Sequence, residues 1–297
     1  MLEKLGTERR NEETMMLDTM SITAVLEAMN KEDASVTEMI HTQIPKIEET
    51  VNAVIDSFNK GGRLIYIGAG TSGRLGILDA VECVPTFGVS PDMVVGLIAG
   101  GLKAFTKAVE GAEDDPELGV QDLKDIQLGE NDTVIGIAAS GRTPYVIGGL
   151  DYARTIAAHT ISISCNEGAK MSSHAEIAIE LPTGPEVLTG STRLKAGSAQ
   201  KMVLNMISTA AMIGVGKAYE NLMIDVQATN EKLQERSKRI IMEATGVDLH
   251  TAAEVYESSG KHVKTATVMI LLDCTKEQAQ ERIEATGGFV RKAIQKA

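Results

Sequence analysis

Short apolar runs alternate with helical stretches through the middle of this chain, and this alternation constrains the fold more than any other feature. Five runs have the composition of buried strands: 63–67, 93–99, 132–140, 159–165 and 175–181. Helical stretches lie between them, near 73–83, 102–111, 117–126 and 144–157. Nearly continuous apolar strands separated by helices are typical of a parallel sheet covered on both faces. The sequence therefore predicts an α/β fold, a three-layer α/β/α doubly wound sheet of about five parallel strands.

A helical segment precedes the predicted sheet. Apolar residues recur at three- and four-residue steps over 36–60, which indicates an amphipathic helix. Pro45 lies inside this pattern and predicts a kink or a break. Lys60 and the two glycines after it are typical signals for the end of a helix.

The last hundred residues contain no further strand pattern. Residues 196–244 are strongly helical, and the tail from about Thr245 has the pattern of three or four short helices. Thr275 and Gln278 have the spacing of a capping box at the start of one of them. We therefore expect a small helical subdomain at this end of the chain.

Composition excludes several classes of function. The formal net charge of −12 argues against nucleic acid or an anionic membrane as a partner. No run approaches the roughly 18 apolar residues of a membrane span, and the polar N-terminus does not resemble a signal peptide. The five histidines do not lie at metal-ligand spacing. We expect a cytoplasmic protein without a metal, because three widely spaced cysteines without CxxC suit a reducing compartment: Cys83, Cys165 and Cys274.

A glycine-rich turn, Gly68-x-Gly70-x-x-Gly73, follows the first predicted strand. This is the spacing of a dinucleotide-binding turn, where a pyrophosphate meets the N-terminus of a helix. A dinucleotide site also needs an acidic residue at the end of the second strand, but that strand ends in two glycines and Asp92 precedes it. No P-loop motif occurs either. The sequence disfavours a nucleotide and leaves a smaller phosphate open.

The residues Ser-Gly-Arg follow two of the predicted strands, in Thr71–Arg74 and in Ala139–Thr143. At the carboxyl edge of a parallel sheet, backbone N–H groups, helix dipoles and hydroxyl groups together favour a phosphate dianion. The alternative is that serine and glycine only cap helices here, but the same device used twice at one edge favours phosphate binding. The candidate binding residues are Gly70, Thr71, Ser72, Ser140, Gly141, Arg142 and Thr143.

A third polar segment, 183–197, lies between the last predicted strand and a long helix. Such a segment can be plain surface, but its length of about fifteen residues favours a functional loop. We expect it to contribute further substrate-binding residues: Glu186, Thr189, Ser191, Thr192 and Lys195.

Two glutamates are candidate acid–base residues. Glu82 lies late in the helix that follows the glycine-rich turn, and its apolar neighbours are expected to raise its pKa by desolvation. Glu113 follows the second predicted strand, where Glu110, Asp114 and Asp115 are equally available by spacing. The alternative for each glutamate is an ordinary solvated surface charge.

The residues resemble one family closely. The segments GAGTSGRLG and AASGRT resemble the sugar isomerase (SIS) fold, a doubly wound phosphosugar-binding domain. The segments TERRN (7–11), ILDAVEC (77–83), VEGAED (109–114) and GPEVLTGSTRLKAG (184–197) resemble the N-acetylmuramic acid 6-phosphate etherases. The resemblance covers essentially the whole chain. It implies an N-terminal helical segment (1–50), an SIS phosphosugar-binding domain (51–222) and a helical C-terminal subdomain (223–297).

The resemblance also implies the chemistry. In this family the D-lactyl ether of N-acetylmuramic acid 6-phosphate is cleaved to N-acetylglucosamine 6-phosphate and D-lactate in cell-wall recycling, without metal, nucleotide or other cofactor. The glutamate that matches Glu82 is the proton donor, and the one that matches Glu113 is the second acid–base residue. We assign Glu82 as the acid toward the lactyl oxygen and Glu113 as the base at C2, although the roles can be exchanged. A homodimer with the site near the subunit interface is also implied.

The chain departs from the family's sequence pattern at two positions, and two alternative functions stay open. Ala138 replaces the first serine of the Ser-x-Ser-Gly-x-Thr turn of SIS isomerases, and Ser198 stands where this family is expected to have threonine. A non-catalytic sugar-phosphate sensor of the same fold is the main alternative, and such a sensor needs neither Glu82 nor Glu113. A nucleotide-dependent oxidoreductase is disfavoured by the missing ribose-binding acid. Four cations are candidates for the phosphate or the lactyl carboxylate: Arg74, Arg142, Arg193 and Lys195.

Overall fold

The computed structural model describes residues 5–107, 109–228 and 230–295 of the 297-residue chain. The chain divides into two compact units, which are described separately below. Unit 1 comprises Met1–Ala80 and Asp92–Ser208, and unit 2 comprises Val81–Pro91 and Thr209–Ala297. The three-part division at residues 50 and 222 stays a prediction.

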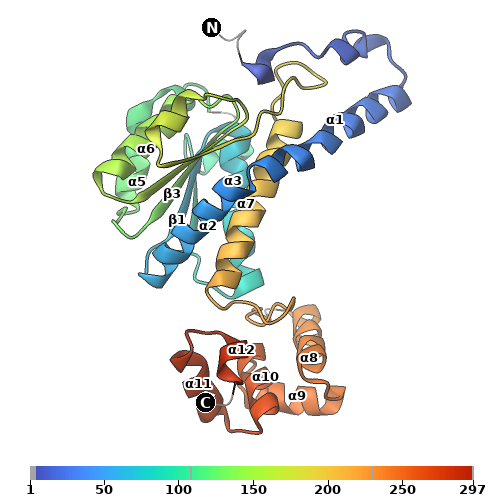
Figure 1. The fold of residues 1–297 in the computed structure, drawn as a ribbon, viewed down its shortest axis with the longest axis vertical. Helices are drawn as coiled ribbons and strands as arrows, with labels where there is room; N and C mark the ends of the chain where they lie inside the picture. The colour runs from blue at the N-terminus through green and yellow to red at the C-terminus, as the bar shows by residue number, and fades with distance from the viewer. Residues whose placement is uncertain (1–4, 108, 229, 296–297) are drawn as a thin grey trace. The chain divides into compact units, whose positions relative to one another are not determined.

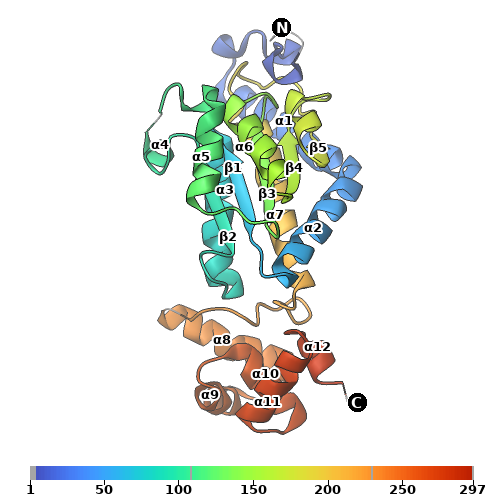
Figure 2. The ribbon, with the colours of Figure 1, turned by 90° about the vertical axis from the view of Figure 1, so that its left-hand side faces the viewer.

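Unit 1 contains a parallel sheet of five strands in the order β2-β1-β3-β4-β5 (Figures 1 and 2). The strands agree with the predicted runs to within a few residues at each end: β1 Leu64–Gly68, β2 Val94–Ile98, β3 Thr133–Ala138, β4 His159–Ser164 and β5 Ile177–Glu180. The fold-class prediction is confirmed. Chain order reverses direction at β1, since β2 pairs on one side of it and β3 on the other. Doubly wound sheets bind ligands at such a switch point.

Helices cover both faces of this sheet (Figure 1). One face is covered by α5 (Pro116–Asp125) and α6 (Pro144–Thr155), whose apolar residues share a core with β1 and β3. The other face is covered by α2 (Ile44–Asn59) and by the first parts of α3 (Gly70–Phe87) and α7 (Lys195–Gly214).

A buried polar network ties the second face together. Tyr66 of β1 donates from its hydroxyl to Asp79 of α3 at 2.8 Å, and Asp79 also accepts from Asn205 and Ser208 of α7. A buried carboxylate is tolerated where such donors satisfy its oxygens. The network therefore fixes the first part of α3 against β1 and α7.

The predicted break in the N-terminal helix is confirmed. Helix α1 (Ile22–Thr42) and helix α2 meet at Gln43, and Pro45 lies in the first turn of α2. Proline is tolerated there because the first N–H groups of a helix have no intrahelical acceptor. Among the described residues, three short 3₁₀ turns precede α1: Gly6–Glu8, Glu12–Thr14 and Leu17–Thr19.

Two helix predictions are partly wrong. The helix expected near 102–111 is only the short α4 (Lys103–Thr106), because Lys107 is extended, and a 3₁₀ turn (Ala112–Asp114) follows further on. Ala108 lies outside the described residues. The helical pattern of 196–244 is interrupted over 215–228, where Gly216 has a φ of +79°, and α8 begins only at Glu231.

Unit 2 contains the helical tail. Its helices are α8 (Glu231–Thr245), α9 (Leu249–Ser258), α10 (Val263–Leu272), α11 (Lys276–Ala285) and the short α12 (Val290–Ala293). They enclose a core of their own that includes Ile241, Tyr256 and Val268. The capping box of Thr275 and Gln278 is confirmed at the start of α11. Among the described residues, no helix has the length and apolarity needed to cross a membrane.

Candidate active site

The glycines of the first turn serve mainly to bring α3 close to β1. A Cβ atom at Gly73 would lie 2.6 Å from the carbonyl oxygen of Gly68, and one at Gly76 would lie 2.7 Å from Cβ of Tyr66. Gly70 differs, because it is exposed and has a φ of +54°. The GxGxxG spacing is therefore explained by close helix–strand packing and by one left-handed turn residue.

The side chains of the first Ser-Gly-Arg turn are engaged within unit 1. Ser72 is buried and donates from Oγ to Oε1 of Gln200 at 2.9 Å. Arg74 donates to the carbonyl oxygens of Ala104 (2.7 Å) and Phe105 (3.0 Å). What this turn offers a ligand is the N-terminus of α3, whose first N–H groups lack intrahelical acceptors.

The second Ser-Gly-Arg turn leaves its side chains unengaged. Within the described parts of the chain, the side chains of Ser140, Arg142 and Thr143 make no hydrogen bond or ion pair, and all three are half-buried. Gly141 has a φ of +67°, and a Cβ atom there would overlap that of Ala169. Two hydroxyl groups and a guanidinium at the start of α6 therefore have no partner in the described part of the chain.

The sheet brings the two turns to one edge. Gly68 of β1 pairs with Ile137 of β3, so that each turn begins within a few residues of the same register position. This is the switch point of the sheet. The predicted convergence of the two motifs is therefore consistent with the strand order.

Glu113 lines a pocket together with the start of α3. This pocket of about 230 Å³ is also lined by Gly70, Arg74 and Glu110. Asp115 does not line it and instead caps α5 through the N–H groups of Glu117 and Leu118. Spacing alone did not separate the four acidic residues of this segment, whereas the structure leaves Glu110 and Glu113 as the two in the pocket.

Glu82 is exposed, so the burial expected from its apolar neighbours is wrong for the single chain. It lies in the part of α3 that belongs to unit 2. Its neighbour Val81 is 61% exposed, and Leu78, one turn earlier on the helix, is 45% exposed. Two of the apolar residues that were expected to desolvate Glu82 therefore face solvent.

Glu186 and Lys195 are engaged inside unit 1. The Glu186 carboxylate is buried and accepts from the backbone N–H groups of Lys195 (3.1 Å) and Ala196 (3.0 Å) at the start of α7. Burial raises the pKa of Glu186, although these two N–H groups oppose the shift. The Lys195 ammonium is buried against Glu32 of α1. Both residues anchor the loop, and their substrate-binding role stays a prediction.

The hydroxyl groups of the same loop are accessible. Thr189 is exposed, and Ser191 and Thr192 are half-buried, with no side-chain hydrogen bond among the described residues. Arg193 is exposed and lines, with Glu186, a pocket of about 170 Å³. Unlike Glu186 and Lys195, these hydroxyl groups and Arg193 are therefore open to a ligand without the loss of an internal contact.

Sequence reasoning missed Asn166, which joins three segments near the second turn. Its side chain donates to the carbonyl of Ala139 at 3.0 Å and to the hydroxyl of Thr7 at 3.1 Å, and it accepts from the Thr7 N–H at 3.3 Å. This contact brings the TERRN segment to the edge of the sheet. The signal that could have found it was its place two residues after β4 at the ligand-binding edge. Among the described residues, no group of three or more histidine, cysteine or acidic residues is arranged to hold a metal ion.

Comparison with solved structures supports the same fold. Phosphoheptose isomerases from Neisseria gonorrhoeae and Francisella tularensis cover 64% and 65% of this chain and 98% of their own chains, with TM-scores of 0.50 and 0.51. Their sequence identities are 14% and 12%, so this likeness concerns the fold alone.

Family models and full-length relatives give the affiliation. Residues 46–154 match the glucokinase regulatory protein N-terminal SIS domain, and residues 115–210 match the SIS domain. N-acetylmuramic acid 6-phosphate etherases from Exiguobacterium sp. and Bacillus cytotoxicus are 66% and 65% identical over 294 residues, which is 99% of this chain and all of theirs. The chain belongs to the N-acetylmuramic acid 6-phosphate etherase family, enzymes of the carbon–oxygen lyase class.

Proposed function

We propose that this chain cleaves the D-lactyl ether of N-acetylmuramic acid 6-phosphate and releases N-acetylglucosamine 6-phosphate and D-lactate. The observation that carries the site assignment is the pocket shared by Glu113 and the N-terminus of α3. A carboxylate and an anion-binding helix start in one pocket suit a substrate that has a phosphate and an acidic C–H bond.

The second Ser-Gly-Arg turn is the proposed phosphate site. Ser140, Arg142 and Thr143 have side chains free of partners among the described residues, and the sheet carries them to the same edge as Gly70. Thr71 and the N–H groups of α3 complete the site. Binding energy gained at the phosphate would hold the sugar so that its C2–C3 bond meets the carboxylates.

The reaction proceeds as an elimination followed by addition of water. In the open-chain sugar, the C1 aldehyde acidifies the proton on C2, and Glu113 takes this proton. The electron pair of the C2–H bond forms a C2=C3 double bond, and the C3–O bond breaks as a carboxylic acid protonates the departing lactyl oxygen. Glu82 is the proposed donor of that proton. Water then adds across the double bond, its hydroxyl to C3 and its proton to C2, which gives the product sugar.

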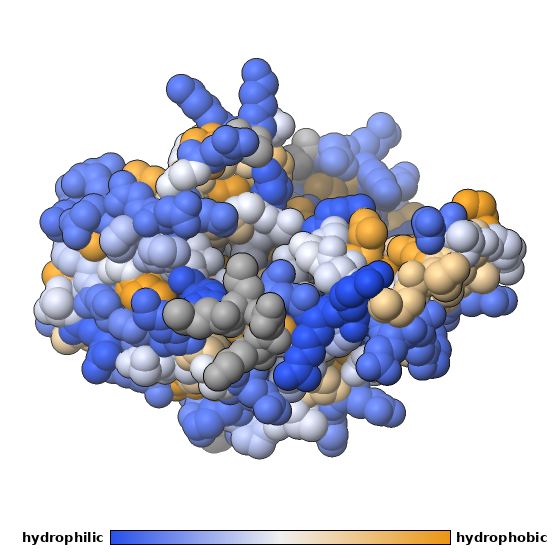
Figure 3. All heavy atoms as spheres, turned by 90° about the horizontal axis from the view of Figure 1, so that it is seen from above, coloured by the Kyte–Doolittle hydropathy of each residue, from blue (hydrophilic) through white to orange (hydrophobic). Residues whose placement is uncertain are grey.

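A homodimer would supply the burial that Glu82 lacks in the single chain. The exposed side chains of Leu78 and Val81 flank Glu82 on α3. A second apolar group, which gathers over the start of α1 (Figure 3), consists of Met15, Met16, Ile22 and Leu26. Large exposed apolar residues of this kind mark association surfaces. A second copy covering α3 would remove water from Glu82, which favours the protonated form that a proton donor needs.

The cytoplasm is the proposed location. Cys83 and Cys165 are buried, and no disulfide joins cysteines among the described residues. Cysteines outside disulfides suit a reducing compartment, where an intracellular phosphosugar is also found.

The test is release of D-lactate from N-acetylmuramic acid 6-phosphate by the wild type and by Glu113→Gln, with Glu110→Gln as the matched control in the same pocket. We expect turnover in the wild type and the control, and a loss of about 10³-fold in Glu113→Gln. Binding of the sugar phosphate without lactate release would favour the sensor alternative, to which the match with a regulatory-protein SIS domain also points.

A further inference from the structure

The helices of unit 2 contain one structural motif twice, 27 residues apart. Each bound of α11 lies 27 residues after the corresponding bound of α9. The same offset relates Gly246 and Asp273, which end α8 and α10 in the left-handed region, and it relates the first residues of α10 and α12. The tail therefore contains two copies of one motif. The first copy runs from the end of α8 through α9 to the start of α10, and the second runs from the end of α10 through α11 to the start of α12, so that α10 belongs to both.

Hydrogen bonds at the two turns repeat with the motif. The N–H of Lys261 donates to the carbonyl of Tyr256 at 2.9 Å, and the N–H of Gly288 donates to that of Ile283, also at 2.9 Å. A hydroxyl group before each turn, from Ser259 or Thr286, donates back to the same carbonyl oxygen. Matching bonds at matching positions mean that the resemblance extends to the details of the turn.

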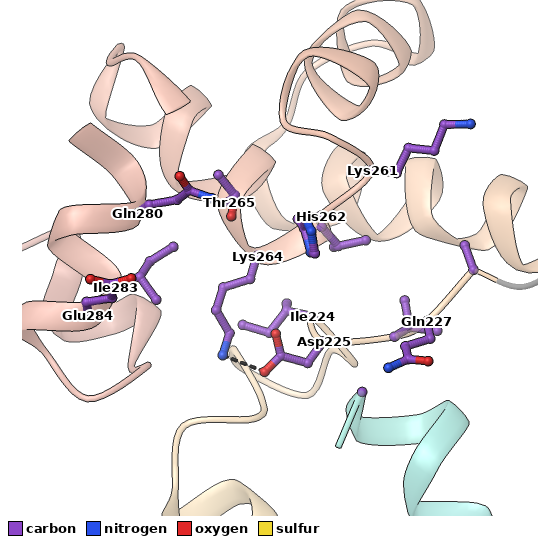
Figure 4. A pocket seen from close by; sticks show the side chains of 14 residues that line it. Ile224, Asp225, Gln227, Lys261, His262, Lys264, Thr265, Gln280, Ile283 and Glu284 are labelled. Carbon is purple, nitrogen blue, oxygen red and sulfur yellow. Dashed lines mark ion pairs between the residues drawn. The ribbon is translucent and has the colours of Figure 1, made fainter. Parts of the chain in front are cut away.

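Equivalent cations of the two copies bind the same segment. Lys264 and Arg291 are the second residues of α10 and α12. Lys264 Nζ donates to the carbonyl of Gly216 at 2.9 Å and forms an ion pair with Asp225 at 2.5 Å (Figure 4). Arg291 lies 3.6 Å from the Glu220 carboxylate and 5.4 Å from the centre of the Tyr219 ring. Segment 216–225 is therefore held at two points.

The held segment contacts the end of α3 that carries Glu82. Gly88 follows the last residue of α3, has a φ of +63°, and leaves no room for a Cβ atom beside the carbonyl oxygen of Asp225. Gly88, Asp225 and Lys264 line one pocket of about 430 Å³. Glu82 lies on α3 less than two helical turns before Gly88, with Pro85 between them, so a shift of Asp225 is passed to Glu82 through a short piece of helix.

We propose that this repeated motif positions the Glu82-bearing end of α3, and that Lys264 is a positioning residue for Glu82 through Asp225 and Gly88. The inference rests on the proposed function only in taking Glu82 as a catalytic residue.

Lys264 has the larger role of the two cations because it is the more buried. Its side chain is 11% exposed, whereas that of Arg291 is 64% exposed. Burial lowers the pKa of Lys264, while Asp225 favours the charged form. An ion pair shielded from water couples its partners more rigidly than one at the surface.

The first test is independent of turnover. Hydrogen exchange is compared between the full-length wild type, Lys264→Met and the matched control Lys261→Met, which alters an exposed lysine of the same pocket. We expect faster exchange over residues 81–91 in Lys264→Met only. Unchanged exchange in that segment would overturn the proposal.

The second test measures kcat and KM for lactate release. We expect Lys264→Met to lower kcat about tenfold with KM within twofold of the wild type, because misplacement of a catalytic group lowers the rate without removing phosphate contacts. In a Glu82→Gln background, Lys264→Met should cause no further loss. Equal losses in both backgrounds would contradict a role through Glu82. An inactive wild type would count against the proposed function, while the exchange result would still decide the positioning.

If Lys264→Met does not fold, Gly88→Ala tests the same contact from the α3 side. The added methyl group must displace the Asp225 carbonyl oxygen, so the same loss in kcat with unchanged KM is expected. A fully active, folded Gly88→Ala would overturn the inference.

Discussion

The two Ser-Gly-Arg turns have the same three residues at the same edge of one sheet, yet their side chains are used in opposite ways. In the first turn, Ser72 and Arg74 bind Gln200 and two backbone carbonyls of the α4 segment. In the second, Ser140 and Arg142 have no partner among the described residues. A repeated motif therefore indicates a shared edge of the sheet but does not assign a shared role to its side chains.

Among the tests of this contrast, the largest expected effect comes from Arg142→Met in the second turn. A free guanidinium at the proposed phosphate site should contribute a charge-assisted hydrogen bond, so KM for the phosphorylated substrate should rise by about 10- to 100-fold. The melting temperature should stay within about 1 °C of the wild type because the side chain has no partner among the described residues. Steady-state kinetics and thermal melts check both values. A large loss of stability with unchanged KM would mean that Arg142 makes internal contacts, as Arg74 does, and the two turns would then not differ.

The sequence alone did not predict this difference between the side-chain contacts of the two turns. The strands, the switch point and the convergence of the two turns followed from apolar runs and from the direction of parallel strands. Ser72 is engaged because it meets Gln200, which is 128 residues away along the chain and has no pattern that links it to the turn. The burial expected for Glu82 failed similarly, because apolar neighbours along a helix bury a residue only when another surface covers them.

The 27-residue repeat is different, since its signal was present in the sequence and was missed. Both copies contain a hydroxyl residue, a glycine and, three positions further on, a valine followed by a cation: Ser259, Gly260, Val263 and Lys264, then Thr286, Gly287, Val290 and Arg291. Such a pattern is detectable by internal periodicity in the residues alone.

Ser72→Ala and Ser140→Ala are matched substitutions that sharpen the comparison. Ser72→Ala removes the hydrogen bond to buried Gln200 and should lower the free energy of unfolding by about 1–2 kcal/mol, with KM changed less than twofold. Ser140→Ala should leave the free energy of unfolding unchanged and raise KM about fivefold. Denaturant unfolding and kinetics on the same two proteins provide the measurements. If both variants changed the free energy of unfolding and KM in the same way, the two turns would be equivalent.

Arg74→Met tests whether the first turn acts on the site indirectly. The lost bonds to Ala104 and Phe105 should loosen the α4 segment and lower the free energy of unfolding by about 1 kcal/mol. Because Arg74 and Glu113 line the same pocket, kcat should fall a few-fold. Lys103→Met, an exposed change in the same short helix, is the control. A rise in KM alone would assign Arg74 to the phosphate instead.

The smallest expected effect concerns the loop 183–197, where Glu186 and Lys195 resemble the polar residues of the first turn in being used internally. Burial alone would raise the pKa of Glu32, but hydrogen bonds from Lys195 and Asn11 outweigh it and lower the pKa below its ordinary value. A carboxyl group with a lowered folded-state pKa stabilises the protein above its unfolded pKa of about 4.3, and this contribution is lost as the pH falls. Buried Glu186 has a raised pKa and acts in the opposite direction.

Glu32→Gln should therefore be less stable than the wild type by at most about 1 kcal/mol at pH 7, and the difference should vanish between about pH 5 and pH 3. Urea unfolding at a series of pH values measures this difference. If the difference instead grew on acidification, Glu32 would not be the ionised partner of Lys195. Lys195 would then be a cation available for substrate, like Arg142 of the second Ser-Gly-Arg turn. The loop would no longer resemble the first turn, whose polar side chains are used internally.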